Sequence, residues 1–186
     1  MPLNTLDSKT ALIVVDLQAG SIGIEMAPHR ATEVVPRASL LADNFRSKGL
    51  PVVLVNVAAA PGARSDQNPE GAAFEMPEQA MPLAPQLGRA DKLITKRTPG
   101  AFTGTDLEHF LRSAGVTQVV VVGVATSDGV ASTVQQAFEL GFHVSVPLDA
   151  VSDPVEARHN YSVTHHFPQR AETGTTEDLL TLLAAS

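Results

Sequence analysis

The sequence of 186 residues contains no cysteine and no tryptophan, and Tyr161 is its one tyrosine. Without cysteine the chain forms no disulfide, no thiolate metal site and no thiol nucleophile. The first ten residues, MPLNTLDSKT, show no signal-peptide pattern, and a cytoplasmic location is therefore expected. The shortage of base-stacking side chains and the net charge of −7 argue against a nucleic-acid partner. No apolar run reaches the roughly 18 residues of a membrane span, so no membrane partner is predicted.

Short apolar runs alternate with stretches of helical spacing along the chain. Strands are predicted at 10–16, 51–57, 92–96, 118–122 and 142–149, with a short sixth strand at 171–175. Helices are predicted at 32–48, 105–113, 153–166 and 176–184, and in the stretch that ends near residue 141. This alternation predicts an α/β fold, a three-layer αβα arrangement with a doubly wound parallel sheet of about six strands in the order 3-2-1-4-5-6. Because there is no internal repeat and no second core, residues 1–186 are predicted to form a single domain.

Single residues predict where several of these elements begin or end. Pro36 is tolerated only in a first helical turn, so the regular part of its helix is predicted to begin near it. Pro154 is placed in the first turn of the helix 153–166, and Thr176 is predicted to cap the last helix. Gly123 is predicted to end the fourth strand and to open a turn.

The stretch from residue 58 to residue 90 differs from the rest of the chain. It contains five prolines and no clear periodicity. Loops of this length in compact domains are usually lids, binding loops or oligomer contacts. An insertion that merely covers part of the surface is the alternative.

Asp16, Lys96 and Gly129 each lie at or just past the carboxyl end of a predicted strand. In a doubly wound sheet these ends meet at one edge, so a carboxylate and an ammonium can face one pocket. Burial of an acid at the end of an apolar strand is costly unless the acid is paired or takes part in chemistry, and Lys96 offsets that cost. The pattern leaves two readings open, a catalytic Asp16 and a structural ion pair or helix cap.

Other side chains near these positions are weaker candidates for chemistry. Three histidines, His159, His165 and His166, cluster near one predicted helix without Asp or Glu partners at metal-ligand spacing. Solvated or capping roles are therefore favoured over a metal site. Ser127 and Ser132 are the hydroxyls nearest the turn, and both are interpreted as cap or helix-surface residues rather than nucleophiles.

Three segments together resemble the isochorismatase-like, or cysteine hydrolase, superfamily: ALIVVDLQ, ITKRTPGAFTGTDLEHFLRSAGV and QVVVVGVATSDGVASTVQQAFELGFHVSVPLDAVSD. Most members of this superfamily hydrolyse amides with an Asp, Lys, Cys triad. Asp16 matches the family aspartate and Lys96 the lysine, whereas the cysteine position falls on Gly129. The resemblance also implies a cis peptide bond between Val124 and Ala125.

The resemblance implies further properties of the site and of the assembly. Substrate contacts are expected from the turn and the loops beside it, namely from Gln18, Phe102, Val124, Ala125 and Thr126. Nicotinamidases of the family carry an Asp/His metal site after the second strand, but residues 56–59 read Asn-Val-Ala-Ala, so neither a metal nor another cofactor is predicted. Family members form dimers or tetramers, which implies a homo-oligomer with residues 58–90 as the candidate contact.

The residue at position 129 decides which reaction is expected. Glycine cannot supply the thiolate that forms an acyl-enzyme, so amide hydrolysis by the family route is not expected. True isochorismatases are similar to this chain in having glycine there, and their vinyl-ether hydrolysis requires a proton donor and water but no covalent nucleophile. The predicted function is therefore an isochorismatase-like hydrolase acting on a small-molecule substrate. Asp16 is its general acid/base, with a pKa that burial raises and Lys96 lowers.

Two alternatives remain open at this point. The first is a catalytically inactive pseudoenzyme that keeps the pocket for binding a small molecule. The second is a hydrolase of another bond, in which Asp16 activates a water molecule. Turnover of a ligand distinguishes the two hydrolases from the binding protein.

Overall fold

A parallel seven-stranded sheet runs through the computed structural model, which describes residues 3–185. Its strands are β1 Thr10–Val15, β2 Val52–Val57, β5 Lys92–Lys96, β6 Gln118–Val124, β7 His143–Pro147, β8 Val151–Ser152 and β9 Glu172–Gly174. The order is β5-β2-β1-β6-β7-β9, with β8 paired to β6, and every pair is parallel. The predicted strand order and doubly wound sheet are confirmed.

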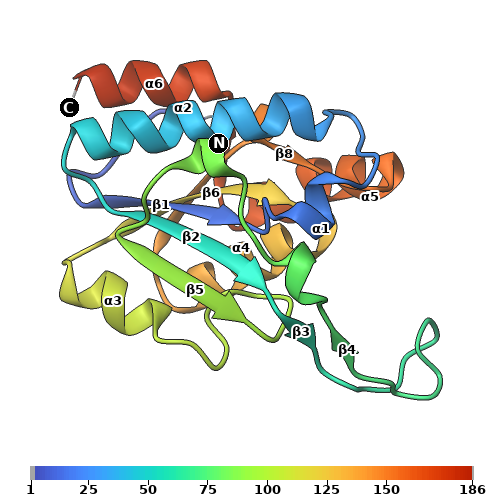
Figure 1. The fold of residues 1–186 in the computed structure, drawn as a ribbon. Coiled ribbons are helices and arrows are strands. Elements are labelled where there is room, and N and C mark those ends of the chain that lie inside the picture. The colour runs from blue at the N-terminus through green and yellow to red at the C-terminus, as the bar shows by residue number, and fades with distance from the viewer. Residues whose placement is uncertain (1–2, 186) are drawn as a thin grey trace.

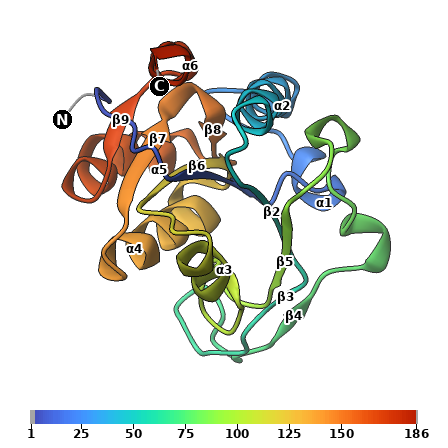
Figure 2. The same cartoon turned by 90° about the vertical axis from the view of Figure 1, so that its left-hand side faces the viewer.

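Helices cover both faces of this sheet, which confirms the three-layer arrangement. The α-helices are α1 Ala19–Ile22, α2 Ala31–Ser47, α3 Leu107–Ser113, α4 Ala131–Glu139, α5 Glu156–Tyr161 and α6 Thr176–Ala185. Shorter 3₁₀ turns lie at Glu78–Ala80, Pro85–Leu87, Leu148–Ala150 and Phe167–Gln169, and π-helical turns at Thr126–Val130 and Ser162–His166. Figures 1 and 2 show α2 and α6 together on one face of the sheet, with α3 and α4 on the other. Within residues 3–185 no helix is long and apolar enough to cross a membrane.

The central strands are apolar on both sides because each side meets its own helix layer. In β1, Leu12 and Val14 belong to the apolar cluster formed with α2 and α6. Ile13 and Val15 belong to the cluster formed with α3 and α4. Successive side chains of a strand point to opposite faces, so a strand covered on both faces appears in the sequence as a continuous apolar run. This is why these strands were predictable.

The predicted start of α2 near Pro36 is wrong. The helix begins at Ala31, so the proline lies in its second turn. The Glu33 carboxylate accepts a hydrogen bond of 3.0 Å from the backbone N–H of Arg30, which stabilises the earlier start. The proline removes one backbone hydrogen bond of the helix but does not prevent the turn before it from forming.

The predicted cap of the last helix is also wrong by one residue. The backbone N–H of Asp178 donates to the Thr175 hydroxyl at 3.1 Å, and the Asp178 carboxylate accepts from the Thr175 N–H at 2.8 Å. Thr175 is therefore the cap, while the Thr176 hydroxyl donates to Asp149 at 3.0 Å. Similarly, α5 begins at Glu156, later than predicted.

Strand β6 continues past Gly123, so the turn predicted there begins only after Val124. Gly123 has φ 118° and pairs with Val15 of β1. A Cβ atom at this position would lie 2.0 Å from the carbonyl oxygen of Val15. Glycine is therefore required for β6 to lie against β1 up to the end of both strands.

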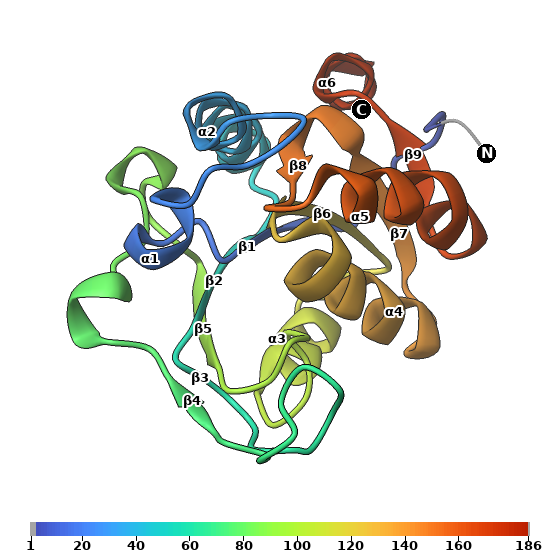
Figure 3. The ribbon, with the colours of Figure 1, turned by 90° about the vertical axis from the view of Figure 1, so that its right-hand side faces the viewer.

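Residues 58–90 leave the sheet after β2 and form an arm that projects from the body of the protein before it returns (Figures 1 and 3). The arm contains two short antiparallel strands, β3 Ala59–Ala60 and β4 Phe74–Glu75. Its Phe74 side chain is 48% exposed. The predicted role of this arm as a lid or oligomer contact stays a prediction.

Candidate active site

Asp16 directly follows β1 at the carboxyl edge of the sheet. Its backbone N–H donates to the carbonyl of Val55 at 2.9 Å, which continues the pairing of β1 with β2. Among residues 3–185 Asp16 is the one residue other than glycine with a positive φ, 53°. Aspartate tolerates this left-handed conformation better than most residues do. The residue is only 6% exposed.

Lys96, the last residue of β5, forms a buried ion pair with Asp16. The distance from its Nζ atom to Oδ2 of Asp16 is 2.8 Å. The same ammonium group donates to the carbonyl oxygens of Pro99 at 2.7 Å and Thr98 at 3.3 Å. Its three hydrogens thus have three acceptors, which compensates for the loss of water around a side chain that is only 2% exposed.

The second carboxylate oxygen of Asp16, Oδ1, is buried and has no hydrogen-bond partner among the described residues. Burial raises the pKa of Asp16 from its ordinary 3.8 to about 6, while the charge and hydrogen bond of Lys96 oppose that rise. The negative charge of Asp128 adds a smaller upward contribution. Asp16 can therefore both give and take a proton near neutral pH.

Gly129 lies against the ion pair. A Cβ atom on it would be 2.9 Å from Oδ2 of Asp16 and 3.2 Å from the carbonyl oxygen of Val124. The first distance is shorter than real Cβ contacts, so this position has no space for a side chain unless Asp16 moves. Asp16, Lys96 and Gly129 thus meet at one edge of the sheet, as their places at strand ends predicted. Their catalytic roles stay predictions.

Hydrogen bonds of its own backbone hold the turn that carries Gly129. The peptide bond between Val124 and Ala125 is cis. The Ala125 carbonyl accepts hydrogen bonds from the N–H groups of Asp128 and Val130, both at 3.1 Å. These two N–H groups are therefore not directed at a ligand.

Two buried side chains from a distant part of the chain also hold this turn. Asp153 is 1% exposed, and its carboxylate accepts from the N–H of Ser127 at 2.8 Å and of Val155 at 2.9 Å. The Nδ1 atom of His159 lies 3.0 Å from the hydroxyl of the fully buried Thr126. Sequence reasoning missed both residues as parts of the site.

The solvated or capping role predicted for His159 is wrong, because the residue is only 4% exposed. Burial lowers the pKa of His159, and the nearby His29 adds to that effect, while Asp153 and Glu156 oppose it. The spacing of His159, Val163 and Phe167 at positions i, i+4 and i+8 was the available signal, since it places all three on one helix face. Among residues 3–185 no group of three or more His, Cys, Asp or Glu side chains could hold a metal ion.

The side chain of Gln18, a predicted substrate contact, is already bound by backbone. Its Nε2 atom donates to the carbonyls of Val57 and Ala80, both at 3.1 Å, and its Oε1 atom accepts from the Val57 N–H at 2.7 Å. It therefore fixes the arm of residues 58–90 to the end of β1. Its role in substrate binding stays a prediction.

Phe102 packs in the apolar core, and the two serines near the turn line a cavity of their own. Phe102 is 8% exposed and belongs to the apolar core, with its ring 6.1 Å from that of Phe142. Ser127 and Ser132 line a cavity of about 500 Å³ between α4 and α5, and Asp16 does not line that cavity. The two serines therefore share no cavity with the candidate acid.

Comparison with known proteins identifies the family of this chain. The sequence profile described as "Isochorismatase domain" matches residues 10–178. The chain belongs to the isochorismatase family. Consistent with this, YecD of Escherichia coli O157:H7, described as an uncharacterized isochorismatase family protein, is 41% identical over 180 residues, which are 94% of this chain and 96% of YecD.

Two further proteins are similar to this isochorismatase-family chain. A solved structure of an isochorismatase family protein from Burkholderia thailandensis has a TM-score of 0.89 and 33% identity, and the match covers 97% of this chain and 98% of that one. A streptothricin hydrolase of Streptomyces noursei is 32% identical over 140 residues, which are 75% of this chain and 48% of that protein. That Gly129 stands at the cysteine position of the family stays a prediction.

Proposed function

We propose that this isochorismatase-family protein hydrolyses a small molecule without a covalent thiol intermediate, with Asp16 as general acid and base. The observation that carries the proposal is the state of the Asp16 carboxyl group. One oxygen is held by Lys96 at 2.8 Å, the other is buried without a partner, and burial raises the pKa to about 6. Gly129 beside it offers no nucleophile, and the chain contains no cysteine.

A vinyl ether is a substrate class that this group can process. Protonated Asp16 gives its proton to the terminal alkene carbon, the alkene electrons form the new C–H bond, and an oxocarbenium ion results. Water adds to that ion and passes a proton to the Asp16 carboxylate, which restores the acid. The hemiketal then divides into an alcohol and a carbonyl compound, so one water molecule is consumed in each cycle.

Lys96 has a positioning role in this reaction. Its ammonium group fixes one carboxylate oxygen of Asp16 and stabilises the negative charge that appears after the proton has left. The unpartnered oxygen is then the one that carries and transfers the proton. The family membership and the hydrolase relative support hydrolysis over the pseudoenzyme alternative.

The test is a turnover assay with a vinyl ether such as isochorismate, and with amides and esters for comparison. With any substrate that is hydrolysed, Asp16→Asn should lower turnover by about 10²–10⁴-fold, the usual contribution of a positioned acid or base. Asp128→Asn, which changes an exposed acid in the same turn, is the matched control and should keep turnover within about threefold. Wild-type turnover in Asp16→Asn contradicts the proposal.

The pH profile separates the two hydrolytic mechanisms. If Asp16 acts as the initial acid, kcat/KM falls as pH rises above about 6, because the proton is lost. If it activates water as a base, kcat/KM rises over the same range. Ligand binding without turnover of any of the three substrate classes supports the pseudoenzyme.

Other properties of the protein are proposed on the same basis. Residues 1–186 are proposed to form a single domain that acts without a metal or other cofactor in the cytoplasm. A homodimer or homotetramer is proposed, with the arm of residues 58–90 and its exposed Phe74 as the contact. Light scattering of the wild-type protein and of Phe74→Ser tests the assembly.

A further inference from the structure

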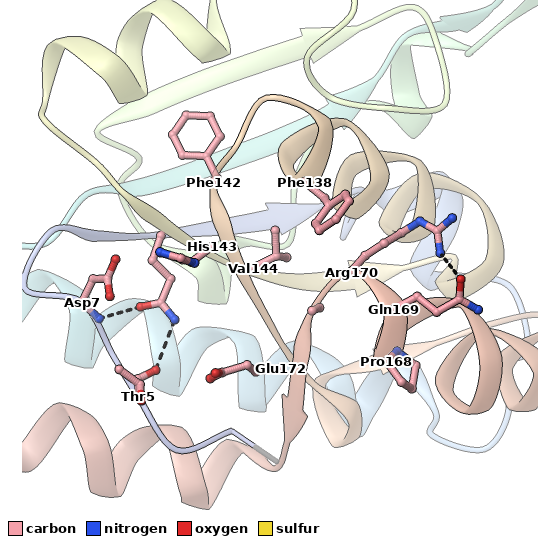
Figure 4. A pocket seen from close by; sticks show the side chains of 12 residues that line it. Thr5, Asp7, Phe138, Phe142, His143, Val144, Pro168, Gln169, Arg170 and Glu172 are labelled. Atoms are coloured by element: carbon pink, nitrogen blue, oxygen red, sulfur yellow. Dashed lines mark hydrogen bonds between the residues drawn. The ribbon is translucent and has the colours of Figure 1, made fainter. Parts of the chain in front are cut away.

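A second cavity lies at the amino-terminal edge of the sheet, at the opposite ends of the strands from Asp16 (Figure 4). Its volume is about 380 Å³, which is within the range of small-molecule sites. The first residues of three neighbouring strands line it: Gln118 of β6, His143 of β7 and Glu172 of β9. The reaction proposed above uses none of these residues.

Glu172 is the residue that makes this cavity unusual. Its Oε2 atom is buried and has no hydrogen-bond partner among residues 3–185. Figure 4 shows its carboxylate directed across the cavity toward the segment that carries Thr5 and Asp7. A buried carboxylate oxygen without a donor is energetically unfavourable, so a donor that enters the cavity would be bound there.

The lining of the cavity includes two carboxylates and one guanidinium group, so it favours a cation over an anion. Asp7 adds a second carboxylate to the lining. Arg170 also lines the cavity, but its guanidinium group donates to the Gln135 side chain, to the His166 carbonyl at 3.3 Å and to Oε1 of Gln169 at 3.4 Å. These neutral acceptors fix the position of the guanidinium group at one end of the cavity, as Figure 4 shows for the contact with Gln169, but they leave its charge in place.

A buried amide group fixes one wall of the cavity. Gln118 is 3% exposed, and its Oε1 atom accepts from the Asp7 N–H at 2.6 Å. Its Nε2 atom donates to the Thr5 carbonyl at 3.2 Å, which Figure 4 shows as a dashed line, and to the Ser145 hydroxyl at 3.0 Å. The shape of the cavity thus rests on hydrogen bonds between distant parts of the chain and not on a loose segment.

An aromatic surface completes the cavity. Phe138 of α4 lines it with a side chain that is 49% exposed, and Val144 and Pro168 add apolar surface. A ring of a ligand can pack on Phe138 while a polar group of the same ligand reaches Glu172. A metal ion is less suitable, because no group of three or more His, Cys, Asp or Glu side chains among residues 3–185 could hold one.

We propose that this cavity binds a small molecule with a primary ammonium group on a ring-bearing apolar body. The ammonium donates to the carboxylate of Glu172, and the ring packs on Phe138. A primary ammonium has three donors and a compact charge, and it pairs with the Glu172 carboxylate without displacing Arg170. The site is separate from Asp16 and does not depend on the proposed hydrolysis.

The test uses benzylamine as the probe and benzyl alcohol as its uncharged match. Two-dimensional NMR of the ¹⁵N-labelled full chain at pH 7 should show saturable shifts at Glu172 and Asp7 with millimolar affinity for benzylamine. Glu172→Gln, which keeps the size of the side chain, should raise the Kd at least about tenfold. Glu177→Gln, an exposed position of α6 that does not line the cavity, should leave it unchanged.

Other results overturn the inference. They are the absence of saturable shifts up to about 20 mM benzylamine, equal binding of benzyl alcohol, or shifts confined to the surroundings of Asp16. Phe138→Ser is a second variant, at an exposed position where the fold is not at risk, and should weaken binding several-fold. Wild-type affinity in both Glu172→Gln and Phe138→Ser also overturns it. Asp16→Asn should bind benzylamine like the wild type, so the two proposals fail separately.

Discussion

Two buried carboxylate oxygens without a hydrogen-bond partner lie at opposite edges of one sheet, Oδ1 of Asp16 and Oε2 of Glu172. At the carboxyl edge, Lys96 lies 2.8 Å from Asp16 and supplies the opposite charge from within the chain. At the amino edge, nothing in the described chain donates to the Glu172 oxygen. Burial alone therefore does not determine what a carboxylate does. With an internal cation it is suited to move a proton, and without one it is suited to bind a cation.

Removal of the Lys96 ammonium group should have the largest effect on stability. Lys96→Met leaves Asp16 buried without its partner and should lower the free energy of unfolding by about 3–5 kcal/mol at pH 8. Lys92→Met is the matched control, because Lys92 begins the same strand and pairs with the exposed Asp106. Its loss should stay below about 1 kcal/mol. Urea unfolding measures both losses. Equal losses would contradict the larger role assigned to the buried ion pair.

The pH dependence of stability should show the cost of the charge on Asp16. Its folded pKa of about 6 lies above the ordinary 3.8, so its contribution is most favourable below pH 3.8 and is lost as pH rises through 6. The stability of the wild type should therefore fall relative to Asp16→Asn by about 2.5 kcal/mol between pH 4 and pH 8. Urea unfolding of the two proteins over this range measures the difference. A difference that does not change with pH would refute the assignment.

A side chain at position 129 should destabilise the carboxyl edge of the sheet and leave the amino edge unchanged. Gly129→Ala places a Cβ atom 2.9 Å from Oδ2 of Asp16 and should cost about 1–3 kcal/mol of stability, with a loss of turnover. Gly23→Ala is the control, because its nearest contact would be an ordinary 3.4 Å. Gly129→Cys meets the same obstruction, so by itself it should not create a thiol amidase. Thermal unfolding compares the variants. Unchanged stability in Gly129→Ala would show that Asp16 can move to make room for the side chain.

The smallest effect is expected at the amino edge. Glu172→Gln removes a buried charged oxygen that has no donor, so stability should stay unchanged or rise by up to about 1 kcal/mol. Asp153→Asn is the contrasting change, because both Asp153 oxygens accept backbone N–H groups, and it should lose about 1–3 kcal/mol. Thermal unfolding measures both. A clear loss in Glu172→Gln would mean that its carboxylate stabilises the fold.

The sequence was sufficient to predict those parts of the molecule that follow from local pattern and strand direction. The run at 10–16 predicted β1 because both of its faces are covered, and parallel strands brought Asp16 and Lys96 to one edge. The start of α2 was missed because a hydrogen bond from the Arg30 N–H to the Glu33 side chain supports a helical turn before Pro36. The i, i+4 and i+8 spacing indicated the burial of His159, but its contact with Thr126 joins distant parts of the chain and could not be predicted.

The cavity at the amino edge could not be predicted for a related reason. It depends on the contact of Gln118 with Asp7, which is 111 residues away in the chain. No periodicity or motif in the sequence indicates such a pairing. Nor does composition reveal that one oxygen of Glu172 is left without a donor.

The left-handed backbone of Asp16 has a consequence for how this site is best studied by mutagenesis. At φ 53° an alanine is strained by roughly 1–2 kcal/mol, whereas asparagine accepts the conformation readily. An alanine scan through this edge would therefore measure the backbone strain of the alanine together with the loss of the carboxyl group. It would overstate the importance of the acid. Libraries that randomise position 16 should for the same reason return asparagine and glycine more often than other replacements, whatever the activity of the variants.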